Sequence, residues 1–168
     1  MSANKSTGPA SAASDGLVST QGETAFRAYL TAEMMMGQQT AKAVGLSGAD
    51  FFGLNLIALS GSISAGELAQ RTGLTSGATT RMIDRLEAAG WVRRVHSTED
   101  RRKVLVEHTD QRQEEINSVL EPGRRLLGEL LQTYDEAQQA VLLDYFTRAT
   151  PVLLAVLEEL RRMGKLQD

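Results

Sequence analysis

Residues 63–109 constrain the fold of this chain more than any other part, because two short helical patterns and two β-prone runs follow one another there. The first helix is predicted over residues 64–71, where Ser64 can cap its amino end. A turn that contains Gly73 leads to a second helix, predicted over residues 75–89. Two short helices joined by a tight glycine-containing turn are typical of a helix-turn-helix.

A β-hairpin is predicted directly after the second helix. Residues 91–95 and 104–107 are β-prone, and the charged turn 97–103 lies between them. Helix, turn, helix and hairpin in this order indicate a winged helix, which is a much more specific pattern than the helix-turn-helix alone. The predicted fold class is therefore mainly α with a small β-hairpin wing.

The second helix has two different faces. At about 100° per residue, its small polar side chains lie opposite the apolar ones, which are predicted to pack on the core. The apolar face holds Ala78, Met82, Leu86 and Ala89, the opposite side holds Ser76, Gly77, Thr80 and Asp84, and Thr79 and Arg81 flank that side. Small hydroxyl groups near a helix amino end can enter a DNA major groove and reach bases or phosphates. Arg81 suits a phosphate, and Arg85 is not predicted to contact DNA.

Charge is distributed unevenly along the chain. The 18 basic and 21 acidic side chains give a net charge of −3, which excludes a uniformly basic coat for nucleic acid. Residues 63–108 nevertheless carry +2, whereas the rest of the chain carries −5. Arg101, Arg102 and Lys103 are consecutive at the predicted hairpin tip, which fits a DNA minor groove. A solvated charged turn is the alternative, and the preceding helix-turn-helix favours DNA contact.

The remaining segments are predicted to be a tail and helices. Leucine-rich helical patterns follow the hairpin, with a kink or an interruption expected at Pro122 and a new helix starting at Pro151. The tail is rich in Ser, Ala, Thr and Gly and is predicted to be disordered. In chain order the predicted segments are the tail (1–20), an N-terminal helix (21–46), the winged helix (47–109) and C-terminal helices (110–168).

Several classes of function are excluded by the residue types present. The chain has no cysteine, which removes disulfides, thiolate metal sites, a catalytic cysteine and thiol redox sensing. The two histidines, His96 and His108, cannot form a histidine-rich metal site, and no catalytic constellation emerges. We therefore expect no enzyme activity, no metal and no cofactor. No stretch is expected to approach the roughly 18 apolar residues of a membrane span, so a cytoplasmic protein without membrane contact is predicted.

The motifs resemble those of the MarR family of bacterial transcription regulators. The resemblance rests on residues 66–74 (GELAQRTGL), 79–92 (TTRMIDRLEAAGWV) and 100–109 (DRRKVLVEHT). The family's wing has an Asp-x-Arg tip followed by a strand that ends near Leu-Thr. Asp100-Arg101-Arg102 and His108-Thr109 match this signature closely.

The resemblance implies a homodimer, in which residues 21–46 and 110–168 form the dimerisation domain. Two winged helices would then read adjacent major grooves of a near-palindromic operator in double-stranded DNA. The resemblance further implies that Arg102 enters the minor groove and that Asp84 helps to orient the wing through an arginine pair. From the residues alone, either Asp100 or Asp84 can pair with an arginine of the tip.

Many members of this family are repressors that are released by small, often aromatic or anionic, ligands. The usual pocket lies between the dimerisation helices and the winged helix. There this chain can supply Met34, Met35, Met36, Gln38, Phe51 and Phe52, and methionines adapt to irregular apolar ligands. Core packing or a dimer contact is the favoured interpretation of these residues, so no ligand is named.

The sequence thus predicts a sequence-specific DNA-binding regulator. The candidate DNA contacts are Ser64, Thr75, Ser76, Gly77, Thr79, Thr80, Arg81, Arg101, Arg102 and Lys103. One alternative is a winged helix that binds an acidic protein partner, and another is a non-specific architectural DNA-binding protein. Small hydroxyl side chains argue mildly against the protein-binding alternative, because hot spots between proteins favour Trp, Tyr and large apolar anchors.

Overall fold

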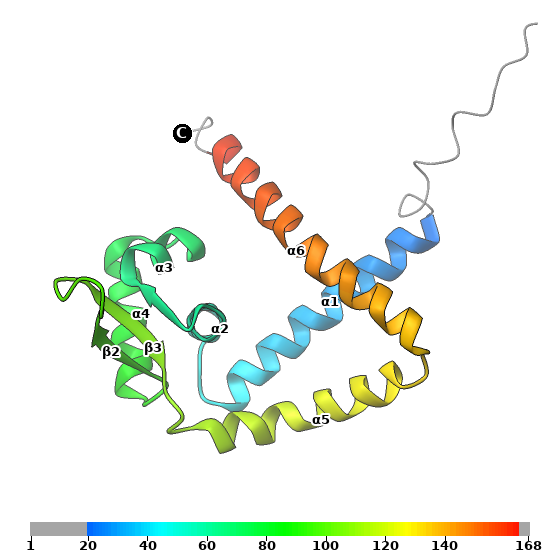
Figure 1. The fold of residues 1–168 in the computed structure, drawn as a ribbon, viewed down its shortest axis with the longest axis horizontal. Coiled ribbons are helices and arrows are strands. Elements are labelled where there is room, and N and C mark those ends of the chain that lie inside the picture. The colour runs from blue at the N-terminus through cyan, green and yellow to red at the C-terminus, as the bar shows by residue number, and fades with distance from the viewer. Residues whose placement is uncertain (1–19, 165–168) are drawn as a thin grey trace, which may run out of the picture. The chain divides into compact units, whose positions relative to one another are not determined.

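The computed structural model describes residues 20–164, so the predicted tail lies outside the described residues except for Thr20. These residues belong to two compact units, which divide within a helix after Val119. In chain order the elements are α1 (Thr20–Ala43), α2 (Gly48–Ser60), β1 (Ser62–Ser64), α3 (Ala65–Thr72), α4 (Ser76–Ala88), β2 (Val92–His96), β3 (Val104–His108), α5 (Gln113–Leu131) and α6 (Glu136–Gly164) (Figure 1).

Side-chain caps mark where α2 and α3 begin. The hydroxyl of Ser47 accepts a hydrogen bond from the backbone N–H of Asp50 at 3.1 Å, which starts α2. Ser64 and Glu67 form a complete capping box at the start of α3. Gly73 ends α3 with a φ of 73°, a left-handed conformation that glycine adopts without the steric cost of a Cβ. The predicted helix-turn-helix therefore has its predicted local structure.

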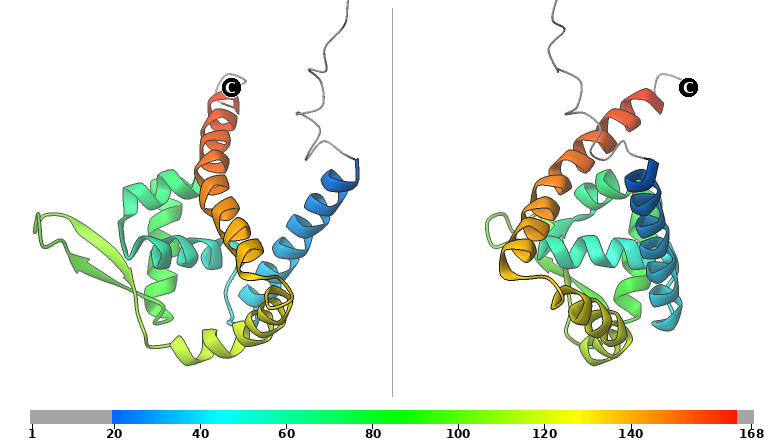
Figure 2. Two further views of the ribbon diagram at one scale, coloured as in Figure 1. Left: turned by 45° about the vertical axis from the view of Figure 1, so that its right-hand side comes forward. Right: turned by 90° about the vertical axis from the view of Figure 1, so that its right-hand side faces the viewer.

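The three strands form one antiparallel sheet in the order β1-β3-β2. β2 and β3 are the predicted hairpin, in which Arg94 lies opposite Val106. Figure 2 shows this hairpin extending beyond α3 and α4 to its tip. β1 is an addition to the predicted fold, and its central Ile63 is paired with Val106 and 2% exposed. A three-residue strand is too short to show an alternating pattern in the sequence.

The core of the first unit lies between the helix-turn-helix, α2 and the sheet. Its buried apolar residues are Val44, Leu54, Ile57, Ile63, Leu68, Met82, Ile83, Leu86, Trp91, Val92 and Val106. The buried face of α4 consists of Thr79, Met82, Ile83 and Leu86, while Ala89 is exposed. Met82 and Leu86 pack as predicted. The buried face is shifted around the helix, because it includes Thr79 and Ile83 in place of Ala78 and Ala89.

Pro122 and Pro151 both lie inside continuous helices. α5 runs through Pro122, so the helix is not interrupted there, and α6 runs through Pro151, so the predicted helix restart is wrong. Proline removes one helical hydrogen bond and crowds the preceding turn. In α6 this local cost falls within 29 residues of otherwise continuous helix, which extends well to both sides of the proline.

α6 is long and apolar enough to cross a membrane by length and composition. An 18-residue window within it has a mean hydropathy of 1.5, and none of that window is buried in the structure. The expectation that no stretch approaches a membrane span is therefore wrong in those terms. Taken together as one broken span, α1 and α2 also meet this length and hydropathy criterion, although one helix is bent by 97° relative to the other. In α6, charged residues interrupt the apolar sequence, and Asp144 and Arg148 form an ion pair at 3.3 Å.

Candidate nucleic-acid interface

The amino end of α4 presents a small polar surface. Thr75 caps the helix by accepting a hydrogen bond from a backbone N–H of the first turn at 3.3 Å. Ser76, Gly77, Thr80 and Arg81 are all exposed, as is Thr75. The Thr80 hydroxyl donates to the Ser76 carbonyl oxygen at 3.0 Å. Exposed backbone N–H groups and small side chains at a helix start allow a nucleic-acid backbone to come close.

Thr79 lies on the opposite side of α4. It is 0% exposed, and its hydroxyl donates to the carbonyl oxygen of Thr75 at 3.0 Å. Thr79 precedes Met82 by three residues, so helical periodicity places both on the buried face. Thr79 is therefore a core residue, which corrects its prediction as a DNA contact.

Ser64 is half-buried at the start of α3. Its hydroxyl donates to the Glu67 carboxylate at 2.8 Å and accepts from the Glu67 backbone N–H at 3.2 Å. The hydrogen bonds from the Ser64 side chain and backbone lower the pKa of Glu67, and the positive charges of Arg71 and Lys103 act in the same direction. Ser64 thus serves first as a helix cap.

The wing tip combines an ordered backbone with exposed cations. Arg101, Arg102 and Lys103 are exposed, and the side chain of Arg102 is 93% exposed. The carboxylate of Asp100 accepts the backbone N–H of Arg102 at 3.0 Å and its Nε–H at 3.4 Å. Nδ1 of His96 lies 3.0 Å from the carbonyl oxygen of Arg101. These contacts hold the turn while leaving guanidinium groups accessible to a polyanion.

Arg94 connects the wing to α4. Its guanidinium donates to Asp84 at 2.6 Å and also ion-pairs with Glu87, which accepts the backbone N–H of Arg94 at 2.9 Å. The hydrogen bond to Asp84 is the main cause of a raised Arg94 pKa, burial opposes it, and Glu87 adds to it. Asp84 thus pairs with an arginine of the wing, and that arginine comes from β2 rather than from the tip.

A second ion pair joins α4 to α2. Arg85 donates to Asp50 through Nε at 3.1 Å and through Nη2 at 2.6 Å. Asp50 is 5% exposed. Burial disfavours its charged form, but hydrogen bonds from Arg85 and Ser47 and the charge of Arg85 lower the pKa of Asp50 overall. The sequence alone does not identify this partner of Arg85.

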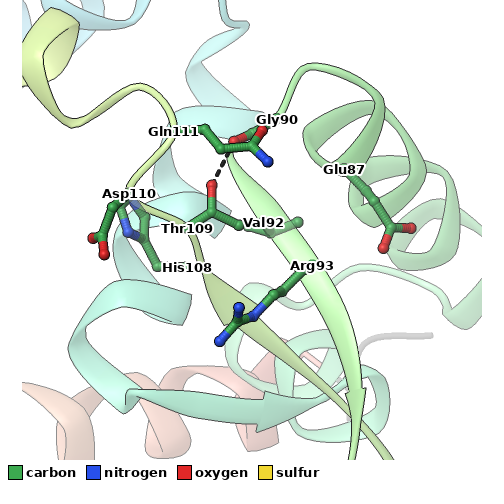
Figure 3. Close-up of a pocket in the computed structure, with 8 residues that line it drawn as sticks. All are labelled: Glu87, Gly90, Val92, Arg93, His108, Thr109, Asp110 and Gln111. Atoms are coloured by element: carbon green, nitrogen blue, oxygen red, sulfur yellow. Dashed lines mark hydrogen bonds between the residues drawn. The ribbon is translucent and has the colours of Figure 1, made fainter.

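The base of the wing is fastened to the start of α5. The Thr109 hydroxyl donates to the Gly90 carbonyl oxygen at 2.5 Å (Figure 3). The guanidinium of Arg112 stacks 4.3 Å from the centre of the Trp91 ring, and Trp91 is 0% exposed. Within the described part of the chain, Nε1 of Trp91 has no hydrogen-bond partner.

A hollow of about 410 Å³ lies beside this junction. Figure 3 shows its lining side chains coming from the end of α4, both wing strands and the segment before α5. They are Glu87, Gly90, Val92, Arg93, His108, Thr109, Asp110 and Gln111. Its charged lining groups are the carboxylates of Glu87 and Asp110 and the guanidinium of Arg93.

The predicted ligand-pocket residues are in different environments. Met34, Met35 and Met36 of α1 are 68%, 62% and 42% exposed. Phe52 is 52% exposed and Gln38 is also exposed, whereas Phe51 packs against the core of the first unit. Phe51 has the core-packing role, and a dimer contact, the other part of the favoured interpretation, stays a prediction for the exposed residues.

Comparisons with known proteins agree with this geometry. Residues 46–104 match the model of the MarR family. The uncharacterized HTH-type transcriptional regulator YdgJ of Bacillus subtilis is 30% identical over 68% of this chain and 70% of YdgJ. The HTH-type transcriptional repressor MdtR of the same species is 32% identical over 57% of this chain and 63% of MdtR. Among solved structures, the transcriptional regulator Tm0710 from Thermotoga maritima shares the fold, with a TM-score of 0.59. The match covers 83% of this chain and 99% of Tm0710, at 23% sequence identity.

The fold and the sequence comparisons agree. The structure has a capped helix-turn-helix and a basic wing that is fixed to α4 by ion pairs. The sequence is related to MarR-family members along most of the chain and of the relative's length. The chain therefore belongs to the MarR family of transcription regulators.

Proposed function

We propose that this MarR-family regulator, which is not an enzyme, binds operator DNA through the amino end of α4 and the tip of the wing. The observation that carries the proposal is the coexistence of a small polar helix start with an exposed Arg-Arg-Lys tip on one winged helix. Ser76, Gly77, Thr80 and Arg81 enter the major groove. Thr75 is adjacent to the phosphate backbone.

The wing extends this contact into the minor groove. Arg102 inserts into the negative potential of a narrow minor groove, and Arg101 and Lys103 bind the flanking phosphates. The pairs of Arg94 with Asp84 and Glu87 set the angle between wing and helix. Asp100 orders the backbone at Arg102.

The working form is a homodimer on a near-palindromic operator. Large apolar side chains are exposed along the helices outside the winged helix, and a second copy of the chain would remove them from water. They include Tyr29, Leu30, Met34, Leu126, Leu127, Leu130, Val141, Leu143, Val152, Leu153, Leu154 and Leu160. This assembly also accounts for the apolar character of α6 in a cytoplasmic protein. Light scattering should give twice the chain mass of 18.2 kDa.

The regulator acts as a repressor that a small aromatic or anionic ligand releases. The similarity to the repressor MdtR supports the direction of regulation. A reporter driven by the operator should be silent with the protein and active after addition of an effective aromatic carboxylate. Higher reporter expression with the protein present would instead identify an activator.

The deciding experiment measures binding to promoter fragments of neighbouring genes in the presence of random duplex DNA. Specific binding should resist the competitor and should weaken steeply with salt, because cations that meet phosphates release counterions. Arg102→Ala should weaken operator binding about tenfold or more without unfolding the protein. Arg93→Ala is the matched control, since Arg93 is an exposed arginine of the same wing that pairs with Glu107 at 3.1 Å.

The two alternatives give different results in this assay. A protein-binding winged helix would show no competitor-resistant DNA binding at any salt concentration. An architectural protein would bind promoter and random duplex equally. Equal operator affinity of Arg102→Ala and the unaltered protein would contradict the role of the wing.

A further inference from the structure

The ion pair between α2 and α4 joins a buried carboxylate to an exposed guanidinium. The Asp50 side chain is 8% exposed, and the Arg85 side chain is 56% exposed. Two bonds, at 2.6 and 3.1 Å, join residues that are 35 positions apart in sequence. The guanidinium therefore meets a carboxylate that the fold has withdrawn from water.

Stability alone does not explain such a pair. Withdrawing the Asp50 carboxylate from water costs free energy that its attraction to Arg85 need not recover, so an apolar pair of similar volume can be as stable. What the bidentate pair adds is geometry, because two parallel bonds fix both the distance and the orientation of the two groups.

The other contacts between α2 and α4 lack this directionality. A Cβ placed on Gly53 of α2 would lie 2.4 Å from Sδ of Met82, so α4 packs directly on the α2 backbone there. Methionine adapts to its surroundings, and apolar contact is non-directional. Packing of this kind permits small rotations of α4 about its axis that a bidentate ion pair opposes.

Such rotations matter at the exposed face of α4. Side chains lie about 5 Å from the helix axis, so a rotation of about 20° displaces them by about 2 Å. Base recognition needs positions held within about 0.5 Å. Arg81 is one turn before Arg85, and Thr80 is next to Arg81, so a fixed Arg85 also fixes the direction of these neighbours.

We infer that Asp50 and Arg85 are a positioning pair for DNA recognition, which sets the rotation of α4 on α2 so that Ser76, Thr80 and Arg81 face the bases and phosphates. The inference rests on the proposed function. Neither residue of the pair needs to touch DNA. Its loss should reduce discrimination between operator and random duplex more than it reduces stability.

The test replaces the pair by apolar residues. Asp50→Leu combined with Arg85→Met removes one charge of each sign, so the net charge and the non-specific attraction to DNA are unchanged. We expect the double variant to melt at or above the temperature of the unaltered protein. Its operator-to-random affinity ratio should fall at least tenfold, while its affinity for random duplex stays within about threefold.

The matched control is the exposed pair of Arg93 with Glu107, which joins two neighbouring strands at 3.1 Å. Arg93→Met with Glu107→Leu makes the same chemical change in the same unit and should retain the operator preference. Arg85→Lys is the second test variant. It keeps the charge but loses bidentate geometry, and it should also lose discrimination, even if the double variant fails to fold.

Three outcomes are distinguishable. Operator discrimination equal to that of the unaltered protein, in either the folded double variant or Arg85→Lys, would overturn the positioning role. An equal loss in the control pair would overturn it as well, because any ion pair of the unit would then matter. If the unaltered protein has no operator preference, the proposed function fails and the inference falls with it.

Discussion

Replacing Arg94 with methionine tests how the wing is attached to α4. Methionine retains much of the apolar stem but removes the contacts to Asp84, at 2.6 Å, and to Glu87. The side chains are 34% exposed for Arg94, 57% for Asp84 and 37% for Glu87, so solvent screens both pairs. Each such pair contributes about 0.2–1 kcal/mol, and Arg94→Met should therefore cost about 1 kcal/mol of unfolding free energy.

The effect on DNA binding should exceed this effect on stability. A wing that is free to change its angle must be ordered again when it enters the groove, and this lowers operator affinity about tenfold, or about 1.4 kcal/mol. Urea denaturation gives the stability of the variant, and fluorescence anisotropy with labelled operator gives its affinity. Both are measured at the same temperature, and the affinity is measured without urea, where the variant is fully folded.

A double-mutant cycle makes the result specific to the pair. Asp84→Asn and Arg94→Met should be non-additive by about 0.5 kcal/mol or more in operator binding, because the two side chains are in contact. Strictly additive effects of the two substitutions would refute the view that this contact orients the wing. The same conclusion would follow if the operator affinity of Arg94→Met stayed within twofold of that of the unaltered protein. Arg93→Met controls for the loss of a wing cation.

Three further predictions concern local contacts. Thr109→Val removes the 2.5 Å hydrogen bond to Gly90 and should cost about 1 kcal/mol in urea denaturation; an unaltered midpoint would contradict this. Ser64→Ala removes the cap of α3 and should lower the free energy of unfolding by about 1 kcal/mol. Amide exchange in the first turn of α3 should become faster, and unchanged exchange there would count against the cap. Because the folded-state pKa of Asp50 is lowered, its ionic stabilisation is complete above an unfolded pKa of about 3.9 and is lost as pH falls through the folded pKa. The stability difference between Asp50→Asn and the unaltered protein should therefore shrink as pH falls below about 4, and a constant difference down to full protonation would disprove the linkage.

Local signals in the sequence predicted much of the winged helix. Ser64 with Glu67, and Gly73 after α3, act over a few residues, so their roles are the same in the sequence and in the structure. The hairpin was predictable for the same reason. β1 was not, because a strand of three residues exists only through its pairing with β3, which comes about forty residues later in the chain.

Side-chain partners were harder to predict than elements. Asp84 was a predicted wing-orienting residue, but its partner Arg94 is ten positions away and is one of several arginines in the wing. Asp50 and Arg85 are 35 positions apart, and only the tertiary fold brings them together. Thr79 was misassigned because the pattern of strictly apolar residues ignored a threonine whose hydroxyl is satisfied within its own helix.

The stacking of Arg112 on Trp91 has a practical consequence. Trp91 is the single tryptophan of the chain, so all indole emission comes from one buried position at the base of the wing. A guanidinium lies 4.3 Å from its ring, and that guanidinium belongs to the residue immediately before α5. The intrinsic fluorescence of this protein therefore reports the junction between the wing and α5 without any added label, and titration with operator or effector can follow that junction directly.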